Sequence, residues 1–181
     1  MNLSYIFAIR VSSFNPYDMK KDKLPKTAEP HLFKSEDSTL IRDAVQQDLP
    51  EIIKLDAQNT GIEKNDYWEA TFERFGNGEP GFFLVAETED HFCGYILGEV
   101  RAWEFGSPPC GWVFALGVHN DAREMGVGSK LFDSICQHFK NTGIEKVRTM
   151  LARSDHLNMS FFRSQGMRGG PFIQLEKNVA D

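Results

Sequence analysis

The first part of the hydrophobic pattern predicts a strand, two helices and a hairpin, in that order. Residues 39–45 (TLIRDAV) are expected to form a short strand. Helices are expected at residues 48–59 and 65–75, where apolar residues recur every three or four positions. The hairpin is expected to have its arms at residues 83–86 and 92–97, with the polar sequence ETED as the turn between them.

Single residues add detail to these elements. Asp48 and Glu51 have the spacing of a capping box, and Pro50 fits the first turn of the helix that follows Asp48. Gly94 interrupts the second arm of the hairpin. A glycine inside a strand indicates a bulge or a close approach of another backbone, so we expect one of these at Gly94.

The second part of the pattern predicts a strand and a long helix, followed by three shorter elements. Residues 112–118 (WVFALGV) are apolar without interruption, which predicts a strand buried on both faces. The long helix is expected between Gly126 and Gly143. Its apolar stripe consists of Val127, Leu131, Ile135 and Phe139. A strand, a helix and a strand are then expected at residues 144–152, 154–166 and 171–177.

The order of these elements predicts one α/β domain over residues 38–181, with a mixed central sheet and helices on its faces. Ser154 or Asp155 is expected to cap the last helix, and Gly166 to end it.

Residues 1–37 are more polar, with three prolines and a lysine cluster, and are interpreted as an N-terminal arm or extension. A flexible or loosely docked arm is expected. The alternative is a segment that covers a substrate site or a partner subunit.

Composition narrows the class of function. The net charge of -6 argues against a general nucleic-acid binder, since phosphate binding needs clustered lysine and arginine. No apolar run is long enough to span a membrane, and the N-terminal YIFAI is too short for a signal-peptide core, so a cytoplasmic location is expected. Cys93, Cys110 and Cys136 lack CxxC spacing, which indicates reduced thiols and no metal site.

The segment VHNDAREMGVGSKLF, residues 118–132, carries the strongest chemical signal. Arg123, Gly126 and Gly128 form an R-x-x-G-x-G pattern between a buried strand and a long helix. The first turn of a helix has unpaired N–H groups and partial positive charge, and glycine lets an anion approach them. Ser129 and Lys130 stand in the reverse order to a nucleotide-triphosphate loop, and the preceding antiparallel hairpin disfavours a dinucleotide-binding fold.

This segment resembles the acyl-CoA-binding motif Q/R-x-x-G-x-G/A of the GNAT superfamily of N-acetyltransferases. FFRSQGM resembles the later FY-x-x-x-GF segment of that family. LIRDAVQQDLPEIIKL resembles its opening strand and helix, and VAETEDHFCGYILG its second and third strands. The likeness runs from about Leu40 to Leu175 and leaves residues 1–37 outside. It implies a mostly antiparallel central sheet flanked by helices, with acetyl-CoA as acyl donor and possible homodimers.

The resemblance also implies a donor site between two diverging strands. Pantetheine would bind the backbone of Leu116, Gly117 and Val118, and the N–H of Val118 would stabilise the thioester oxygen. Asn158 either reaches the cofactor or is a plain surface amide. The pyrophosphate would be held by backbone N–H groups of Arg123, Glu124, Met125, Gly126, Val127, Gly128 and Ser129.

The usual proton-transfer residues of the family are missing. Its fourth strand often holds a glutamate base, but WVFALGV contains no carboxylate. Glu99, Glu104 and His119 are the remaining candidate bases, although each also suits a solvated surface or turn position. The usual acidic tyrosine is replaced by Phe162.

Two functions remain on this basis. The first is transfer of an acetyl group from acetyl-CoA to a primary amine of a small molecule or protein, by direct attack in a ternary complex. The alternative is a non-catalytic acyl-CoA-binding or regulatory module, which both departures from the family pattern favour.

Overall fold

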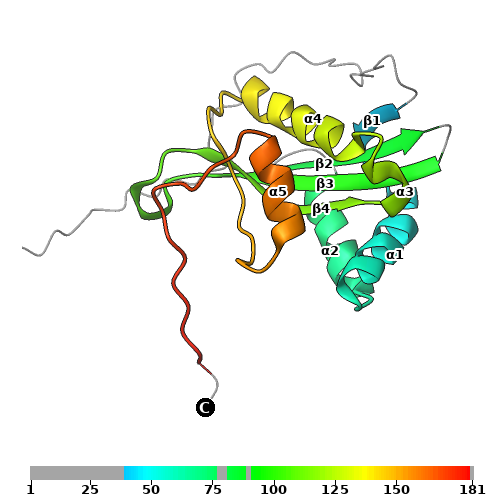
Figure 1. Ribbon diagram of the computed structural model, residues 1–181, viewed down its shortest axis with the longest axis horizontal. Coiled ribbons are helices and arrows are strands. Elements are labelled where there is room, and N and C mark those ends of the chain that lie inside the picture. The colour runs from blue at the N-terminus through cyan, green and yellow to red at the C-terminus, as the bar shows by residue number, and fades with distance from the viewer. Residues whose placement is uncertain (1–38, 77–80, 89–90, 180–181) are drawn as a thin grey trace, which may run out of the picture.

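The computed structural model describes residues 39–76, 81–88 and 91–179, and these residues form a mixed α/β fold around a sheet in the order β1-β2-β3-β4-β5 (Figure 1). The strands are β1 (Thr39–Asp43), β2 (Gly81–Thr88), β3 (His91–Arg101), β4 (Cys110–Val118) and β5 (Val147–Arg148). The helices are α1 (Leu49–Thr60), α2 (Asn65–Phe75), α3 (Asn120–Arg123), α4 (Val127–Asn141) and α5 (His156–Ser164), with 3-10 turns η1 (Gln46–Asp48) and η2 (Glu104–Gly106). The first four strands pair in antiparallel fashion and β5 is parallel to β4, which confirms the expectation of a mixed, mostly antiparallel sheet. The expected N-terminal arm, residues 1–37, lies outside the described residues.

The sheet separates two hydrophobic cores. Helix α4 covers one face, and α1 and α2 cover the other (Figure 1). Because side chains alternate along a strand, Leu84 packs in the α4 core and its neighbour Val85 in the α1–α2 core. Ile96 and Leu97 of β3 divide in the same way. Both faces of β2 and β3 are therefore buried, which explains their nearly continuous apolar sequence.

Helices α2 and α4 confirm the predictions made from the apolar periodicity of the sequence. Helix α2 covers residues 65–75, as expected, and buries Trp68 and Phe75. Helix α4 begins after Gly126 and ends before Gly143. All members of its expected stripe are fully buried, at 0% exposure: Val127, Leu131, Ile135 and Phe139.

Gly94 confirms the expected irregularity in β3. Ala86 pairs with Gly94 and the next residue of β2, Glu87, pairs with Phe92, so Cys93 is an extra residue in β3. A Cβ atom at Gly94 would lie 2.5 Å from the carbonyl oxygen of Gly117. The backbones of β3 and β4 therefore approach at a point where a side chain would not fit.

A second bulge lies in β4. Leu97 pairs with Ala115 and Gly98 with Val113, so Phe114 is the extra residue. As a result, Phe114 and Ala115 both pack against the α1–α2 core, although they are neighbours in the strand. Val113 belongs to the α4 core.

The expected capping box at Asp48 is wrong. The side chain of Asp48 forms no hydrogen bond that caps α1. Its carboxylate accepts hydrogen bonds from the guanidinium of Arg42, at 2.7 Å, and from the backbone N–H of Val45, at 2.7 Å. Glu51 pairs with Lys54 on the surface. A bidentate guanidinium is a stronger partner than a backbone N–H, so Arg42 determines the orientation of Asp48.

Of the two strands expected near the C-terminus, one is shorter than the sequence predicts and the other does not form. Strand β5 comprises two residues of the expected range 144–152, and residues 171–177 form no strand. The ring of Phe172 stacks instead on the guanidinium of Arg148, with 4.5 Å between guanidinium carbon and ring centroid. Ile173 and Leu175 are exposed. A strand needs a neighbouring edge for its hydrogen bonds, and β5 offers very little edge to pair with.

Asp155 is the residue that caps α5, and we expect its replacement by alanine to destabilise the fold by about 1 kcal/mol. Its carboxylate accepts a hydrogen bond from the backbone N–H of Asn158 at 3.1 Å. Urea denaturation would measure the loss. Ser154→Ala is the matched control, because Ser154 lies next to the cap without serving as it, and equal effects of the two variants would contradict the assignment.

Candidate active site

The strands β4 and β5 diverge soon after they pair. Gly111 pairs with Val147 and Trp112 with Arg148, and the two chains then separate. A pocket of about 330 Å³ opens beside this point. It is lined by residues 113–116 of β4, residues 149–151 after β5, Asn158 and Phe162 of α5, and Asp56, Lys64, Tyr67, Trp68 and Tyr95. The divergence also leaves Phe114 and Leu116 half-buried, although the sequence predicts a strand buried on both faces.

The hydrogen-bond phase of β4 determines which backbone groups face this gap. The N–H of His119 donates to the carbonyl of Cys93 at 2.9 Å, and Val118 is opposite Gly94. Because hydrogen-bonded and non-hydrogen-bonded pairs alternate in an antiparallel ladder, the N–H and C=O groups of Val118 and Leu116 point away from β3. The carbonyl of Val118 indeed accepts a hydrogen bond from Arg123 Nε, at 3.3 Å.

The glycine-rich segment forms the tight entry to α4. The short helix α3 ends at Arg123, a turn follows, and Gly126 precedes α4 with a φ of 72°. This left-handed conformation favours glycine. Arg123, Glu124 and Met125 are exposed. The N–H groups of Val127, Gly128 and Ser129 lie in the first helical turn, where the helix itself provides no acceptor for them.

The first turn of α4 packs closely against α5 and the end of β4. A Cβ atom at Gly128 would lie 3.2 Å from the ring of Phe161 and 3.6 Å from Cγ2 of Val118. Ser129 Oγ accepts a hydrogen bond from Gln165 Nε2 at 3.0 Å. Gly128 therefore brings the loop and the β4 edge together, in a space that a larger residue would fill.

Asn158 lies in the pocket, and its orientation is determined by the cap of α5. Its side-chain amide nitrogen donates to Asp155 Oδ2 at 2.7 Å, and its backbone N–H donates to the other carboxylate oxygen. The amide is thus held in place at the edge of the cavity.

None of the three candidate bases is among the described residues that line the pocket. Glu99 lies between two guanidinium groups, 3.0 Å from Arg74 Nη2 and 2.9 Å from Arg101 Nε. Glu104 is exposed in η2. The ring of His119 meets Phe92 edge-to-face, with centroids 6.0 Å apart. As bases, the three residues stay predictions.

Apart from Asn158, the polar groups of the pocket come from residues that the sequence analysis did not select as polar site residues. Asp56 is buried in α1 and accepts a hydrogen bond from Trp68 Nε1 at 2.9 Å. Lys64 Nζ lies 2.8 Å from the same carboxylate. Burial, then the charge of Asp56 and the neighbouring Tyr67, raises the pKa of Tyr95, so its phenol stays neutral. No local motif signals these residues, because tertiary packing brings them together.

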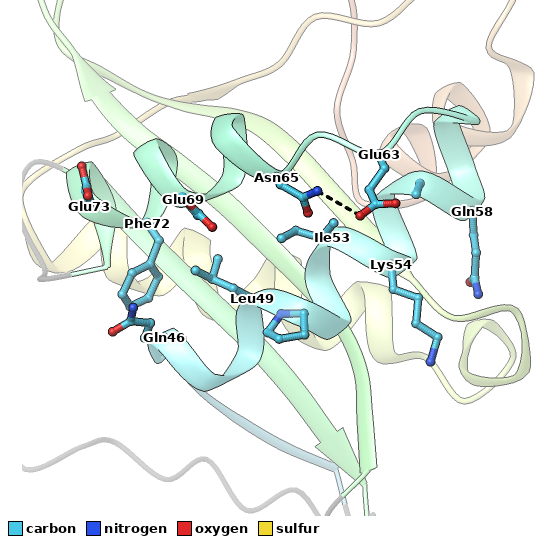
Figure 2. A pocket seen from close by; sticks show the side chains of 12 residues that line it. Gln46, Leu49, Ile53, Lys54, Gln58, Glu63, Asn65, Glu69, Phe72 and Glu73 are labelled. Atoms are coloured by element: carbon cyan, nitrogen blue, oxygen red, sulfur yellow. Dashed lines mark hydrogen bonds between the residues drawn. The ribbon is translucent and has the colours of Figure 1, made fainter.

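A larger pocket of about 870 Å³ lies away from this site, in the groove between α1 and α2 (Figure 2). Its lining includes the apolar residues Leu49, Ile53 and Phe72, and also Asn65, which donates a hydrogen bond to Glu63 at 2.9 Å. None of the described residues of the glycine-rich segment lines it. Its volume exceeds that of the β4 pocket, but it has no connection to the chemical signal in the sequence.

The thiols of Cys110 and Cys136 are poorly suited to metal binding or nucleophilic attack. Burial, with the nearby Asp133, raises the pKa of Cys136 to about 11, and burial also raises that of Cys110. Within residues 39–76, 81–88 and 91–179, no group of three or more histidine, cysteine or acidic side chains could hold a metal ion. In the same part of the chain, no helix is long and apolar enough to cross a membrane.

Residues 47–167 match the model of the acetyltransferase (GNAT) family. The match covers more than half of the sequence, and the protein therefore belongs to this family, as the sequence motifs imply. A comparison with curated proteins finds no match.

Solved structures of acetyltransferases share the fold at low sequence identity. Aminoglycoside N-acetyltransferase AAC(6')-Iy in complex with CoA superposes with a TM-score of 0.69 and 15% identity, over 78% of this chain and 95% of that one. An aminoglycoside acetyltransferase from an uncultured soil metagenomic sample, in complex with sisomicin, has a TM-score of 0.63 and 18% identity, over 79% and 97%. A possible acetyltransferase from Clostridium difficile 630 has a TM-score of 0.65 and 20% identity, over 80% and 100%.

Proposed function

We propose that the protein transfers an acetyl group from acetyl-CoA to a primary amine of a small molecule or protein, by direct attack in a ternary complex. One observation carries the proposal. The glycine-rich first turn of α4 lies against the end of β4, where the N–H and C=O groups of Leu116 and Val118 point away from β3, and a pocket lies beside this edge. An anion-binding turn and an unpaired strand edge suit the two ends of an acyl-CoA.

The residues present fit this donor. The first N–H groups of α4, on Val127, Gly128 and Ser129, offer donors for a pyrophosphate. In the preceding turn the N–H of Met125 already donates to the carbonyl of Ala122, at 3.2 Å. Leu116 and Val118 would pair with the pantetheine amides as with an added strand. The acetyl thioester supplies the group that is transferred. The N–H of Val118 would stabilise negative charge that develops on the thioester oxygen. Solved relatives in complex with CoA and with a CoA-linked analogue support this choice of donor.

Proton transfer needs a different solution from the usual one of the family. An amine of pKa about 10.4 is protonated at neutral pH and must lose a proton before attack. We propose that Glu99, Glu104 or His119 accepts this proton through water, because none of the three lines the pocket among the described residues. Water would also protonate the leaving thiolate, whose pKa is about 8.5.

Phe162 provides a test of the missing acid. Its ring is buried against Phe132, with centroids 5.6 Å apart, yet it also lines the pocket. We expect Phe162→Tyr to raise kcat about tenfold, because the new hydroxyl could protonate the leaving thiolate. Phe161→Tyr is the control, since Phe161 packs on Gly128 outside the described pocket lining. An unchanged rate in a folded Phe162→Tyr variant would exclude this position for an acid.

A non-catalytic acyl-CoA-binding module is the second candidate. The absence of a carboxylate from β4 and the presence of Phe162 favour it. Both candidates require donor binding, and they differ in turnover.

Calorimetric titration with acetyl-CoA, with CoA and an adenine nucleotide as controls, tests the donor site. Release of CoA thiol in the presence of a panel of primary amines then tests catalysis. Binding with amine-dependent thiol release is the result expected. Binding without release from any amine would favour the non-catalytic module, and no binding by folded protein would contradict both candidates.

A further inference from the structure

An ion pair lies inside the pocket beside β4. Lys64 Nζ is 2.8 Å from Asp56 Oδ2, and Trp68 Nε1 donates to the same oxygen at 2.9 Å. The ammonium group also lies 5.8 Å from the centroid of the Tyr67 ring. A carboxylate together with an aromatic face is a typical environment for an ammonium cation in proteins.

The two partners differ in their freedom to move. The side chain of Asp56 is 10% exposed and belongs to α1, whereas that of Lys64 is 33% exposed. Lys64 directly precedes α2, at the end of a short connection that begins at Gly61, whose φ is 75°. Lys64 can therefore turn into water, but Asp56 cannot. When Lys64 leaves, Asp56 keeps the neutral hydrogen-bond donor Trp68 but has no counter-charge. Because a buried carboxylate without a counter-charge is unfavourable, binding of another cation is favoured in place of Lys64.

The ion pair shares its cavity with the edge of β4. Residues 113–116 and Asn158 line the same space of about 330 Å³, a volume at the lower end of small-molecule sites. Among the described lining residues, Asp56 and Lys64 are the charged ones. When Lys64 turns away, the cavity retains a single negative charge and the ring of Tyr67, which complement a small cation.

We propose that Asp56 binds an ammonium group of the acceptor, and that Lys64 occupies this position until the acceptor arrives. The inference rests on the proposed acetyl transfer. The ammonium at Asp56 is not the amine that reacts, because a carboxylate partner stabilises the protonated form, which cannot attack a thioester. The acceptor is therefore a small molecule with more than one amino group, one bound as a cation at Asp56 and another directed to the β4 edge.

Trp68 allows the site to be tested without any acyl transfer. The chain contains three tryptophans, so a protein labelled with ¹⁵N-tryptophan gives three indole signals. Trp103→Phe and Trp112→Phe assign two of them, and the third belongs to Trp68. Spermidine is titrated into the full chain at about 0.15 M ionic strength without acetyl-CoA, so that only the cation site is measured.

We expect saturable movement of the Trp68 signal, with the Trp103 and Trp112 signals unchanged. Lys64→Gln removes the internal competitor and should lower the Kd for spermidine about tenfold, whereas Asp56→Asn should raise it at least about tenfold. Lys54→Gln is the matched control, because Lys54 pairs with Glu51 at 3.4 Å on the exposed face of α1, the helix that carries Asp56. The Kd of the Lys54→Gln variant for spermidine should equal that of the wild type. The Trp103 and Trp112 signals also report whether each variant is folded.

Equal Kd values for the wild type, Lys64→Gln and Asp56→Asn would overturn the proposal, as would a Trp68 signal that does not respond to spermidine.

A kinetic experiment then tests the acceptor class. With acetyl-CoA present, kcat/KM for 1,4-diaminobutane should exceed that for 1-aminobutane about tenfold, and Asp56→Asn should abolish the preference. If no amine is acetylated, the proposed function fails, while the titration still decides whether Asp56 is a cation site.

Discussion

Gly126→Asp is expected to reduce acetyl-CoA binding about a thousandfold. Two unit charges about 4 Å apart at an effective dielectric constant of about 20 repel by about 4 kcal/mol, which is about a thousandfold in Kd. The new carboxylate would stand where the pyrophosphate is proposed to bind. No atom lies within 4 Å of a Cβ built at Gly126, so the side chain itself meets no steric obstacle in the protein. Gly128→Asp should have an effect of the same size, with added crowding of Phe161. Isothermal titration calorimetry would measure the Kd.

Two controls separate charge from backbone strain. Gly126→Asn has nearly the shape of aspartate without its charge and should weaken binding far less. Gly143→Asp places the same residue at another left-handed position, with a φ of 81° and no atom within 4 Å of its Cβ, just beyond the opposite end of α4. We expect it to bind acetyl-CoA as the wild type does. Unchanged affinity in folded Gly126→Asp and Gly128→Asp variants would contradict the phosphate loop.

Phe139→Ala is expected to lower the free energy of unfolding by about 4 kcal/mol, in the range typical of buried phenylalanine. Phe139 has no exposed surface and lies directly over two glycines of the sheet. A Cβ at Gly98 would lie 2.9 Å from its ring, and one at Gly111 would lie 2.6 Å from it. Because glycine has no side chain that could fill the vacated space, the cavity would persist. Urea denaturation would measure the difference.

Leu157→Ala is the control for this loss. Leu157 lies in α5 and is 63% exposed, so its truncation should change the stability by less than about 0.5 kcal/mol. A loss below about 1.5 kcal/mol for Phe139→Ala would indicate that α4 moves inward to fill the cavity.

Much of the fold could be predicted because local pattern and tertiary packing agree. The stripe from Val127 to Phe139 identifies α4 and its buried face, since a helix repeats every 3.6 residues wherever it packs. The glycine-rich turn could be predicted from Gly126, whose left-handed conformation few other residues adopt. These features depend on neighbours in the sequence.

The features that could not be predicted depend on residues far apart in the chain. Asp48 has a good capping sequence, but Arg42 competes for its carboxylate. The apolar residues at 171–177 resemble a strand, yet a strand forms only where another edge is available. From the sequence, Asp56 resembles a surface residue of an amphipathic helix, but in the structure Trp68 donates a hydrogen bond to it. Contacts of this kind depend on the three-dimensional arrangement, and no periodic pattern in the sequence indicates them.

Because β4 and β5 pair over only two residues, the region around α5 is held less firmly than the central strands. Helix α5 and the segment around it are attached to the rest mainly through Phe161, Phe162 and Met167, which pack against the α4 core, rather than through a long ladder of backbone hydrogen bonds. Such a segment opens at a lower free energy than the central strands, and its amide hydrogens should exchange with solvent first. A ligand held between β4 and α5 would join these two regions, so that its binding would slow exchange in α5 more than in β2 or β3.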